Sequence, residues 1–241
     1  MRILLFQIRN PDDAMLAQEF NCFLTKLEPM RESRPFQLES CNIIRRTESY
    51  KELWKAYDQI MVGGSGDYGC VNNQEPWFLT FCEVLRAIVD SGKPMFCSCF
   101  GHQALAAAMG GEVIRDRSRA ELGTLEVTLN EKGRKDPLLG SLNNPFLAQF
   151  GHNDQVSRLP AGAVNLASTS KCEVQAYKLA DKPIYSTQFH PELSCQENRE
   201  RAERYFEVYD PGLSHPDKLK ELFKPTEPAS ALLRRFVEMY S

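Results

Sequence analysis

The stretch that most constrains the fold of this chain is PMFCSCFGHQALAAAMGG, residues 94–111. Pro94 opens a short apolar run of strand length. From Gly101 onward the residues are good helix formers, up to a glycine pair that can cap a helix. The pattern therefore predicts a strand, a sharp turn at Cys99 and a helix.

The predicted position of Cys99 favours a reactive thiolate. A residue on a strand-to-helix turn holds its side chain clear of the sheet, and the helix behind it offers free backbone N–H groups and the positive end of its dipole. Both favour the thiolate, which is the nucleophilic form of cysteine. With serine, the same geometry is the nucleophile elbow of the α/β-hydrolases. Taken alone, Cys99 could also be a buried small hydrophobic residue, which is the usual state of a free cysteine.

A second motif supplies the partners that such a thiolate needs. TQFHPE, residues 187–192, follows an apolar run at 183–186 that is typical of a strand. His190 can accept the thiol proton, and Glu192 can hold the imidazole in the right tautomer and stabilise the imidazolium. Together with Cys99, these residues form a predicted nucleophile, base and orienting carboxylate.

The combination of CFGHQ at 99–103 with HPE at 190–192 resembles the class I, triad-type glutamine amidotransferases. Within that family the resemblance is closest to the glutaminase domain of GMP synthase and its stand-alone relatives. It implies that Cys99, His190 and Glu192 are a catalytic triad.

The run Gly63-Gly64-Ser65-Gly66 follows a predicted strand at 59–62. Clustered glycines most often mark a tight turn, and this run lacks the lysine of a P-loop and the spacing of a dinucleotide fingerprint. In the family that the chain resembles, a glycine loop at this place supplies a backbone N–H to the oxyanion hole. The resemblance implies that Gly64 and Phe100 donate their N–H groups to the developing oxyanion.

Two further segments match the family: Glu121-Leu122-Gly123 is similar to its E-x-G segment, and His152-Asn153-Asp154 to its H-x-D segment. In relatives the second segment lines the glutamine pocket, which implies substrate-binding roles for His152 and Asp154. A structural role for His152, hydrogen-bonded within a turn with Asp154, is an equal alternative.

Two side chains close to Cys99 in sequence are assigned different roles. Gln103 lies one helical turn after Cys99 and is the better candidate for holding the substrate amino acid. His102, on the first turn of the helix, is expected to point away from Cys99 and to be structural.

Strands alternate with helices along the first half. Strands are expected at 2–8, near 36–44 and at 59–62, and helices over 16–27, 50–57 and 75–91. This alternation predicts an α/β fold with a doubly wound, mostly parallel open sheet and helices on both faces, and the resemblance implies a flavodoxin-like order. Active sites in such sheets lie beyond the carboxyl ends of the strands, where both the glycine run and Cys99 fall.

The second half shifts towards short strands. They are expected at 112–114, 125–129, 147–150, 164–167 and 171–177, and predict a small antiparallel β portion packed beside the main sheet. The basic run at 115–119 is interpreted as a solvated surface loop. A helix is expected over 198–209, and two more helical segments in 216–241. No linker or internal repeat is found, so the sequence predicts one domain, 1–241, with a helical C-terminal tail at about 211–241.

Composition is that of an ordinary globular chain. The 241 residues are 42% hydrophobic and 25% charged, and a net charge of −3 gives no electrostatic reason to expect nucleic acid or an anionic membrane as a partner. No apolar stretch approaches transmembrane length and no signal-peptide pattern is found, so we expect a cytoplasmic protein with reduced cysteines. Cys97-Ser98-Cys99 lacks the C-x-x-C spacing of zinc and redox sites, and we expect no metal and no cofactor.

The sequence thus predicts a cysteine-dependent hydrolase of the side-chain amide of glutamine, or of a γ-glutamyl amide, that acts through a γ-glutamyl thioester and releases ammonia or an amine. The chain contains no S-G-G-x-D-S nucleotide loop. An alternative is therefore a glutaminase subunit that delivers ammonia to a separate synthetase, such as a GMP synthase-type ATP pyrophosphatase. A non-catalytic binding or regulatory module is a third possibility, which the intact Cys99, His190 and Glu192 disfavour.

Overall fold

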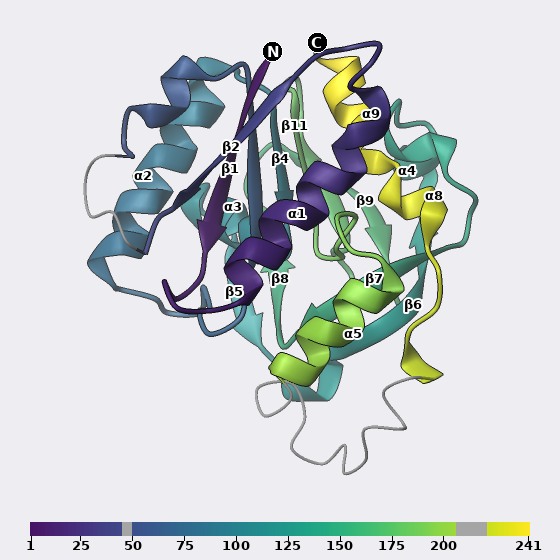
Figure 1. The fold of residues 1–241 in the computed structure, drawn as a ribbon. Helices are drawn as coiled ribbons and strands as arrows, with labels where there is room; N and C mark the ends of the chain where they lie inside the picture. Colours follow the sequence, from purple (N-terminus) through teal and green to yellow (C-terminus); the bar gives the residue numbers. More distant parts are fainter. Residues whose placement is uncertain (45–49, 206–220) are drawn as a thin grey trace.

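A nine-stranded sheet forms the centre of the computed structural model, which describes residues 1–44, 50–205 and 221–241 (Figure 1). Five neighbouring strands are parallel, in the order β2 (Gln37–Asn42), β1 (Arg2–Ile8), β3 (Gln59–Ser65), β4 (Met95–Ser98) and β11 (Ile184–Thr187). This is the strand order of flavodoxin-like sheets. The predicted doubly wound fold is confirmed.

The same sheet continues with four antiparallel strands, in the order β10 (Ala176–Leu179), β9 (Ala163–Ser168), β6 (Glu121–Leu129) and β7 (Phe146–His152). The predicted antiparallel portion is thus joined to the parallel strands by the pairing of β10 with β11, and does not merely pack beside them. A separate two-stranded antiparallel sheet consists of β5 (Glu112–Arg115) and β8 (Asp154–Arg158). Strand β8 was not predicted from the sequence.

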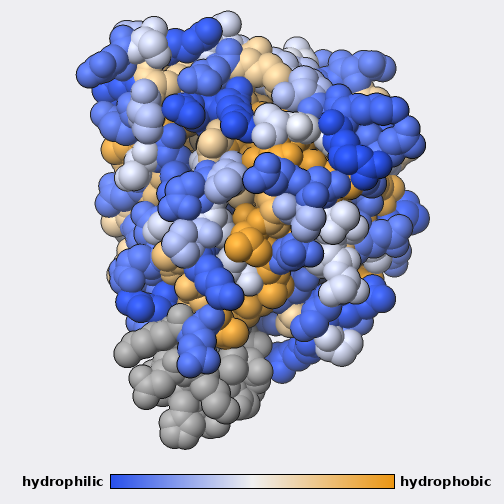
Figure 2. Space-filling view, turned by 90° about the vertical axis from the view of Figure 1, so that its right-hand side faces the viewer, coloured by the Kyte–Doolittle hydropathy of each residue, from blue (hydrophilic) through white to orange (hydrophobic). Residues whose placement is uncertain are grey.

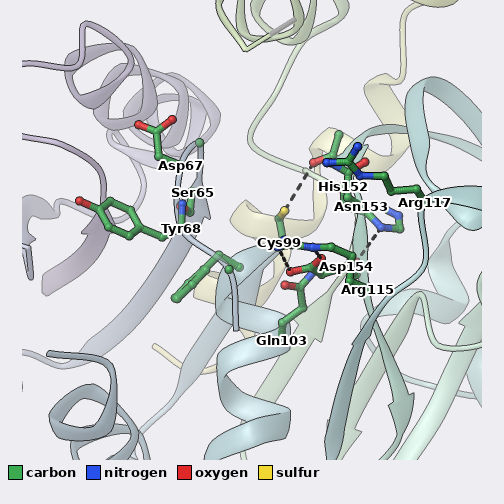
Figure 3. Close-up of a pocket in the computed structure, with 14 residues that line it drawn as sticks. Ser65, Asp67, Tyr68, Cys99, Gln103, Arg115, Arg117, His152, Asn153 and Asp154 are labelled. Carbon is green, nitrogen blue, oxygen red and sulfur yellow. Dashed lines mark hydrogen bonds and ion pairs between the residues drawn. The ribbon is translucent and has the colours of Figure 1, made fainter. Parts of the chain in front are cut away.

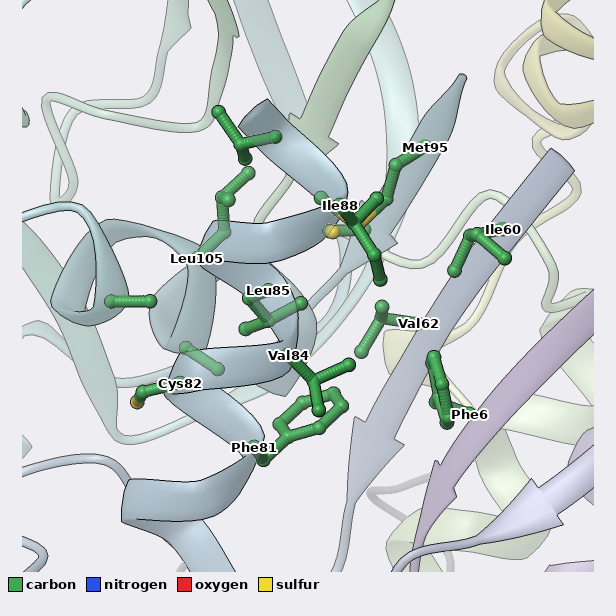
Figure 4. Close-up of a cluster of buried hydrophobic side chains, with 14 of the residues drawn as sticks. Phe6, Ile60, Val62, Phe81, Cys82, Val84, Leu85, Ile88, Met95 and Leu105 are labelled. Carbon is green, nitrogen blue, oxygen red and sulfur yellow. The ribbon is translucent and has the colours of Figure 1, made fainter. Parts of the chain in front are cut away.

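Helices cover both faces of the parallel strands (Figure 1). One face carries α1 (Met15–Leu27) and α9 (Leu232–Met239), and the other carries α2 (Pro76–Ser91) and α3 (Phe100–Ala108). Successive residues of β1 point to opposite faces, so Leu4 and Phe6 pack in the α2 side core and Ile3 in the α1 side core. Figure 4 shows the α2 side core, where helix side chains meet Phe6 and Val62. A strand buried on both faces reads as a continuous apolar run, which is why β1 was predictable.

Helix ends follow local capping. α2 begins at a proline and ends at Gly92, whose φ of 70° suits glycine. α5 (Cys195–Arg204) begins before the predicted 198, because the Ser194 side chain accepts from the Glu197 N–H and the Glu197 side chain accepts from the Ser194 N–H. Positions 206–209 of that predicted helix lie outside the described residues.

Two other local predictions were imprecise, and one short helix was missed. The short helix expected at 50–57 is a 3₁₀ turn at Leu53–Ala56. The strand expected from 171 begins only at Ala176, because the side chain and backbone of Thr169 hold Cys172 in a turn. The short helix α4 (Glu131–Arg134) was not predicted.

The described part of the C-terminal segment is mostly helical, although residues 223–226 belong to no helix. It contains α8 (Glu227–Ser230) and α9, and Leu232, Leu233, Phe236 and Val237 of α9 are buried. Positions 211–220 of the predicted tail lie outside the described residues. These side chains pack in the core on the α1 side of the sheet.

The surface is mostly polar. Figure 2 shows one face, in which hydrophilic residues surround a band of hydrophobic ones. In the described ranges, the large apolar side chains that are exposed are Leu79 and Leu147. None of the described helices combines the length and the apolar composition that a membrane crossing requires.

A close approach between α3 and β3 depends on Gly101. A Cβ atom at Gly101 would lie 2.8 Å from the side chain and from the carbonyl oxygen of Val62. We expect Gly101→Ala to lower the free energy of unfolding by about 1–3 kcal/mol, because helix and strand must separate. Urea unfolding at unchanged m-value measures it, with the half-buried Ala107→Ser on the same helix as a control that should change stability by about 0.5 kcal/mol or less. Equal stability of Gly101→Ala and wild type would contradict the tight packing.

Candidate active site

Cys99 lies at the bend between β4 and α3, at φ 50° and ψ −103°. Only glycine adopts such a conformation without strain, so the surrounding structure must hold this residue in place. The Cys99 N–H donates to the Thr187 carbonyl at 2.9 Å, and the Cys99 carbonyl accepts from the Gln103 N–H at 3.2 Å. The strand, sharp turn and helix read from the sequence are thus present, with Cys99 at the turn.

His190 and Glu192 lie beside Cys99. The His190 Nδ1 is 2.6 Å from the Glu192 Oε1, and Cys99 is close enough to raise the pKa of His190. The Cys99 Sγ itself lies 3.8 Å from the Gly151 carbonyl oxygen. His190 is 5% exposed and Glu192 is 0% exposed. The loop after β11 holds them, since the His190 N–H donates to the Gln149 carbonyl of β7 at 2.9 Å. The fold therefore brings together residues that are far apart in sequence.

The electrostatics of this group favour a charged histidine. Burial alone would lower the pKa of His190, but the negative charges of Glu192 and Cys99 and the hydrogen bond to Glu192 raise it to about 9. Burial alone would raise the pKa of Glu192, but the His190 charge, the hydrogen bond to it and the Arg201 guanidinium lower it to about 2. At neutral pH Glu192 is therefore a carboxylate that stabilises an imidazolium.

A pocket of about 280 Å³ opens next to Cys99 (Figure 3). Its base is formed by Cys99, Phe100 and Gln103. One wall consists of residues 65–69, and the other of residues 151–154 together with Arg115 and Arg117. In Figure 3, Asp154, Arg115 and Gln103 gather on the same side of Cys99. The pocket therefore lies at the carboxyl ends of β3 and β4, as expected from the order of strands and helices.

The predicted substrate-binding residues line this pocket, but several of their polar groups bind the protein itself. The Gln103 Nε2 donates to the Asp154 carbonyl at 2.8 Å and to the Gln188 Oε1 at 3.1 Å. The His152 ring lies 2.9 Å from the Asp154 carbonyl through Nδ1 and 2.9 Å from the Glu121 carboxylate through Nε2. These bonds fix the shape of the wall, so His152 has the hydrogen-bonded role that was one of the two alternatives.

Glu121 is the anchor of this wall. It is buried, and it accepts hydrogen bonds from His152, from the Thr169 hydroxyl at 2.6 Å and from the Gln175 amide. Burial would raise the pKa of Glu121, but its hydrogen bonds and the charge of His152 lower it. The E-x-G and H-x-D segments noted in the sequence thus meet through paired strands β6 and β7, where Glu121 lies opposite His152.

The two predicted oxyanion donors differ in the structure. Phe100 begins α3 and lines the pocket, and the first N–H groups of a helix have no partner within it. Gly64 does not line the pocket, and its N–H donates to the Glu19 Oε1 at 3.0 Å. Gly63 and Gly64 also extend β3 as far as Ser65, so the tight turn interpretation of this run is wrong. The Gly64 N–H therefore faces a buried carboxylate of α1 in this structure.

The basic run at 115–119 contributes to the pocket, which the sequence did not indicate. The Arg115 Nε lies 2.6 Å from the Asp154 Oδ1, and the Arg115 Nη2 lies 3.1 Å from the Asp154 Oδ2. The guanidinium and the carboxylate therefore form a bidentate ion pair. Arg117 lines the same pocket. The interpretation as a plain surface loop is thus incomplete. The missing information is the pairing of β5 with β8, which sets Arg115 opposite Asp154.

His102 and Cys97 are near Cys99 in sequence but do not line the pocket. His102 is fully buried, with its Nδ1 3.0 Å from the Ser186 hydroxyl, and burial lowers its pKa to about 3. It is therefore neutral and structural, as expected. Cys97 is fully buried in β4, and burial raises its pKa well above the usual range, so it remains a thiol at neutral pH.

Comparisons with known proteins identify the family of this chain. A sequence model of the family described as glutamine amidotransferase class-I matches residues 31–207. One subunit of a glutamine-hydrolysing GMP synthase from Sulfurisphaera tokodaii is 34% identical over 146 residues, which are 61% of this chain and 73% of that protein. A glutamine-hydrolysing GMP synthase from Clostridium novyi is 31% identical over 153 residues, 64% of this chain. The matched region spans only 28% of the Clostridium protein.

A solved structure gives the same fold over the whole chain. A glutamine amidotransferase from Thermotoga maritima superposes with a TM-score of 0.76 at 19% identity, over 99% of this chain and 97% of that one. At this identity the likeness shows the fold alone, whereas the family match covers most of the sequence and includes Cys99, His190 and Glu192. The chain belongs to the class I glutamine amidotransferase family.

Proposed function

We propose that this protein hydrolyses the side-chain amide of glutamine, or of a γ-glutamyl amide, with Cys99 as nucleophile. One observation carries the proposal: His190 lies 2.6 Å from Glu192 and beside Cys99, which is at a strained strand-to-helix turn. A buried histidine held by a carboxylate is the acid–base partner that a nucleophilic cysteine needs.

The first half of the reaction forms a thioester. The Cys99 sulfur attacks the amide carbon, a C–S bond forms, and the carbonyl electron pair moves to oxygen. The Phe100 N–H stabilises that oxyanion, whereas the Gly64 N–H stays bonded to Glu19. His190 then gives its proton to the leaving nitrogen. The C–N bond breaks, and ammonia or an amine departs from a γ-glutamyl thioester.

The second half releases glutamate. A water molecule replaces the departed amine, and neutral His190 takes one of its protons as oxygen attacks the thioester carbon. The C–S bond breaks, and His190 is again charged beside the Cys99 thiolate. Glu192 accepts the Nδ1–H throughout and keeps the other ring nitrogen directed at the reacting atoms.

Substrate binding is assigned to the residues that line the pocket. Gln103, His152 and Asp154 hold the wall in place, and Arg117, which lines the same pocket, is assigned to the amino-acid end of the substrate. Because the Asp154 carboxylate is already paired with Arg115, it serves as part of a fixed ion pair and not as a lone charge.

A second candidate function is ammonia delivery to a separate synthetase. It is favoured by the similarity to proteins named as one subunit of glutamine-hydrolysing GMP synthase, 34% and 36% identical in two cases. In this case the chain would supply ammonia to a partner such as a GMP synthase-type ATP pyrophosphatase.

The test is steady-state release of ammonia or amine from glutamine and from a panel of γ-glutamyl amides. We expect Cys99-dependent turnover of at least one of them by the purified protein. An increase of tenfold or more in glutamine turnover, on addition of a GMP synthase-type ATP pyrophosphatase with its substrates, would favour the second candidate. If no compound is turned over with or without that partner, both candidates fail.

A further inference from the structure

A buried network of charges connects the Cys99 site to α1 and α5. Arg201 of α5 is 3% exposed and Glu19 of α1 is 0% exposed. The Arg201 Nη1 lies 3.3 Å from the Glu192 Oε1, the same oxygen that accepts from His190. The Arg201 Nη2 lies 3.9 Å from the Glu19 Oε1. One arginine thus bridges the carboxylate beside His190 and a second carboxylate that the family motifs do not include.

Glu19 also reaches the other side of the site. Its Oε1 accepts from the Gly64 N–H at 3.0 Å and from the Arg9 Nη2 at 3.0 Å, and its Oε2 accepts from the Gln7 amide at 3.2 Å. A Cβ atom on Gly64 would lie 3.0 Å from the His190 ring. The end of β3 next to His190 is therefore held by the same carboxylate that faces Arg201.

We propose that Arg201 and Glu19 are positioning residues of the hydrolysis: Arg201 holds Glu192 against His190, and Glu19 holds both Arg201 and the Gly64 backbone. This inference rests on the proposed function. Arg201 is well placed for this role because its Nε is also fixed, donating to the Gln18 Oε1 at 2.8 Å. A guanidinium bound on two sides keeps one orientation.

The charges of the network bear directly on His190. The network contains three buried carboxylates, those of Asp13, Glu19 and Glu192. Two buried guanidiniums, Arg9 and Arg201, neutralise two of these negative charges, and the imidazolium of His190 neutralises the third. Removing a guanidinium should therefore strengthen the hold on the His190 proton, and removing a carboxylate should weaken it.

Other titratable groups also face this network. They are Glu197 on α5, Tyr205 at its end, Cys22 on α1 and Cys99 itself. Burial raises the pKa of Cys22 and of Tyr205 far above neutrality, so neither changes charge in the working range. Glu197 is held in the capping box of α5.

The decisive experiment uses two variants with opposite expected shifts. In Arg201→Gln, the alkaline limb of the pH profile of kcat/KM, where His190 loses its proton, should move up by roughly one pH unit. In Glu19→Gln, which keeps an oxygen for the Gly64 N–H, it should move down by a similar amount. Turnover should fall in both, and Arg201→Lys should restore the wild-type limb because it keeps the charge.

A matched control lies on the same helix. Arg199 pairs at 3.6 Å with the half-exposed Glu203 and hydrogen-bonds Gln196, both on α5 and outside the site, so Arg199→Gln should leave the profile unchanged. If Arg201→Gln does not fold, Glu19→Gln and the double variant Arg201→Gln/Glu19→Gln still test the proposal. The double variant loses one charge of each sign, so its alkaline limb should stay close to that of wild type. The proposal is overturned if Arg201→Gln and Glu19→Gln fold and the alkaline limbs of their pH profiles do not move, or move in the same direction.

The rate of Cys99 alkylation by iodoacetamide can be measured against pH in the absence of substrate. It compares the pH profiles of wild type, Arg201→Gln and Glu19→Gln independently of turnover. If turnover does not depend on Cys99, the proposed function fails, and opposite shifts in the alkylation profile would still support the coupling of the network to His190. If turnover depends on Cys99 but neither profile shifts, the inference alone fails.

Discussion

Replacing Cys99 by alanine should lower ammonia or amine release by about 10⁴-fold or more, because the nucleophile that forms the thioester is removed. The neighbouring thiol cannot substitute: Cys97 is fully buried within β4, and burial raises its pKa well above the usual range. Cys195→Ala, which changes a half-buried thiol on α5, is the control and should keep wild-type activity. Release within tenfold of wild type in Cys99→Ala would contradict the assignment.

The backbone at position 99 adds a second expectation, on stability. Alanine keeps the strain of φ 50° and ψ −103°, whereas glycine relieves it. Cys99→Gly should therefore be as inactive as Cys99→Ala and yet more stable by about 1 kcal/mol. Chemical denaturation of the two inactive variants measures the difference. A less stable Cys99→Gly would show that the turn carries no strain.

Replacing Glu192 by glutamine should lower kcat/KM by about 10²–10⁴-fold, because the amide no longer stabilises the imidazolium or selects its tautomer. The same change should lower the pKa of His190, which the Glu192 charge helps to raise to about 9. The alkaline limb of the pH profile should then move towards neutrality. A pH titration of rate from about 6 to 10 checks both effects, and a profile like that of wild type would exclude the ion pair as the source of the high pKa.

The pair also makes stability depend on pH in a defined direction. The folded pKa of His190 is about 9, above its usual value, so its contribution is fully present below the unfolded pKa and is lost as pH rises through 9. The folded pKa of Glu192 is about 2, below its usual value, so its contribution is present above the unfolded pKa and is lost as pH falls towards 2. Wild type should thus lose stability between about pH 7 and 10, and Glu192→Gln should lose much less.

Much of the fold was predictable because local patterns specify it. The buried strand at Arg2–Ile8 and the helix Pro76–Ser91 with its glycine end have signals that lie within a few residues. The strand, turn and helix around Cys99 are equally local. The strand expected from 171 failed because a side-chain turn at Thr169 competes with strand pairing, which periodicity does not reveal.

The candidate site shows the limits of local patterns. The sequence pointed to Cys99, His190 and Glu192 because nucleophile, base and carboxylate form recognisable motifs. It could not show that Asp154 is paired with Arg115, because that contact depends on strands β5 and β8 lying side by side. It also could not show that the Gly64 N–H turns to Glu19, since a carboxylate on an amphipathic helix gives no sign of being fully buried.

The sequence by itself thus determined which residues can do chemistry and which segments form strands and helices, because both depend on residue type and short spacings. Only the tertiary structure decided what surrounds them. It paired Arg115 with Asp154, fixed His152 on Glu121 and placed Glu19 and Arg201 behind the Cys99 site. These arrangements depend on long-range packing and on the need of buried charges for partners, which no local pattern encodes.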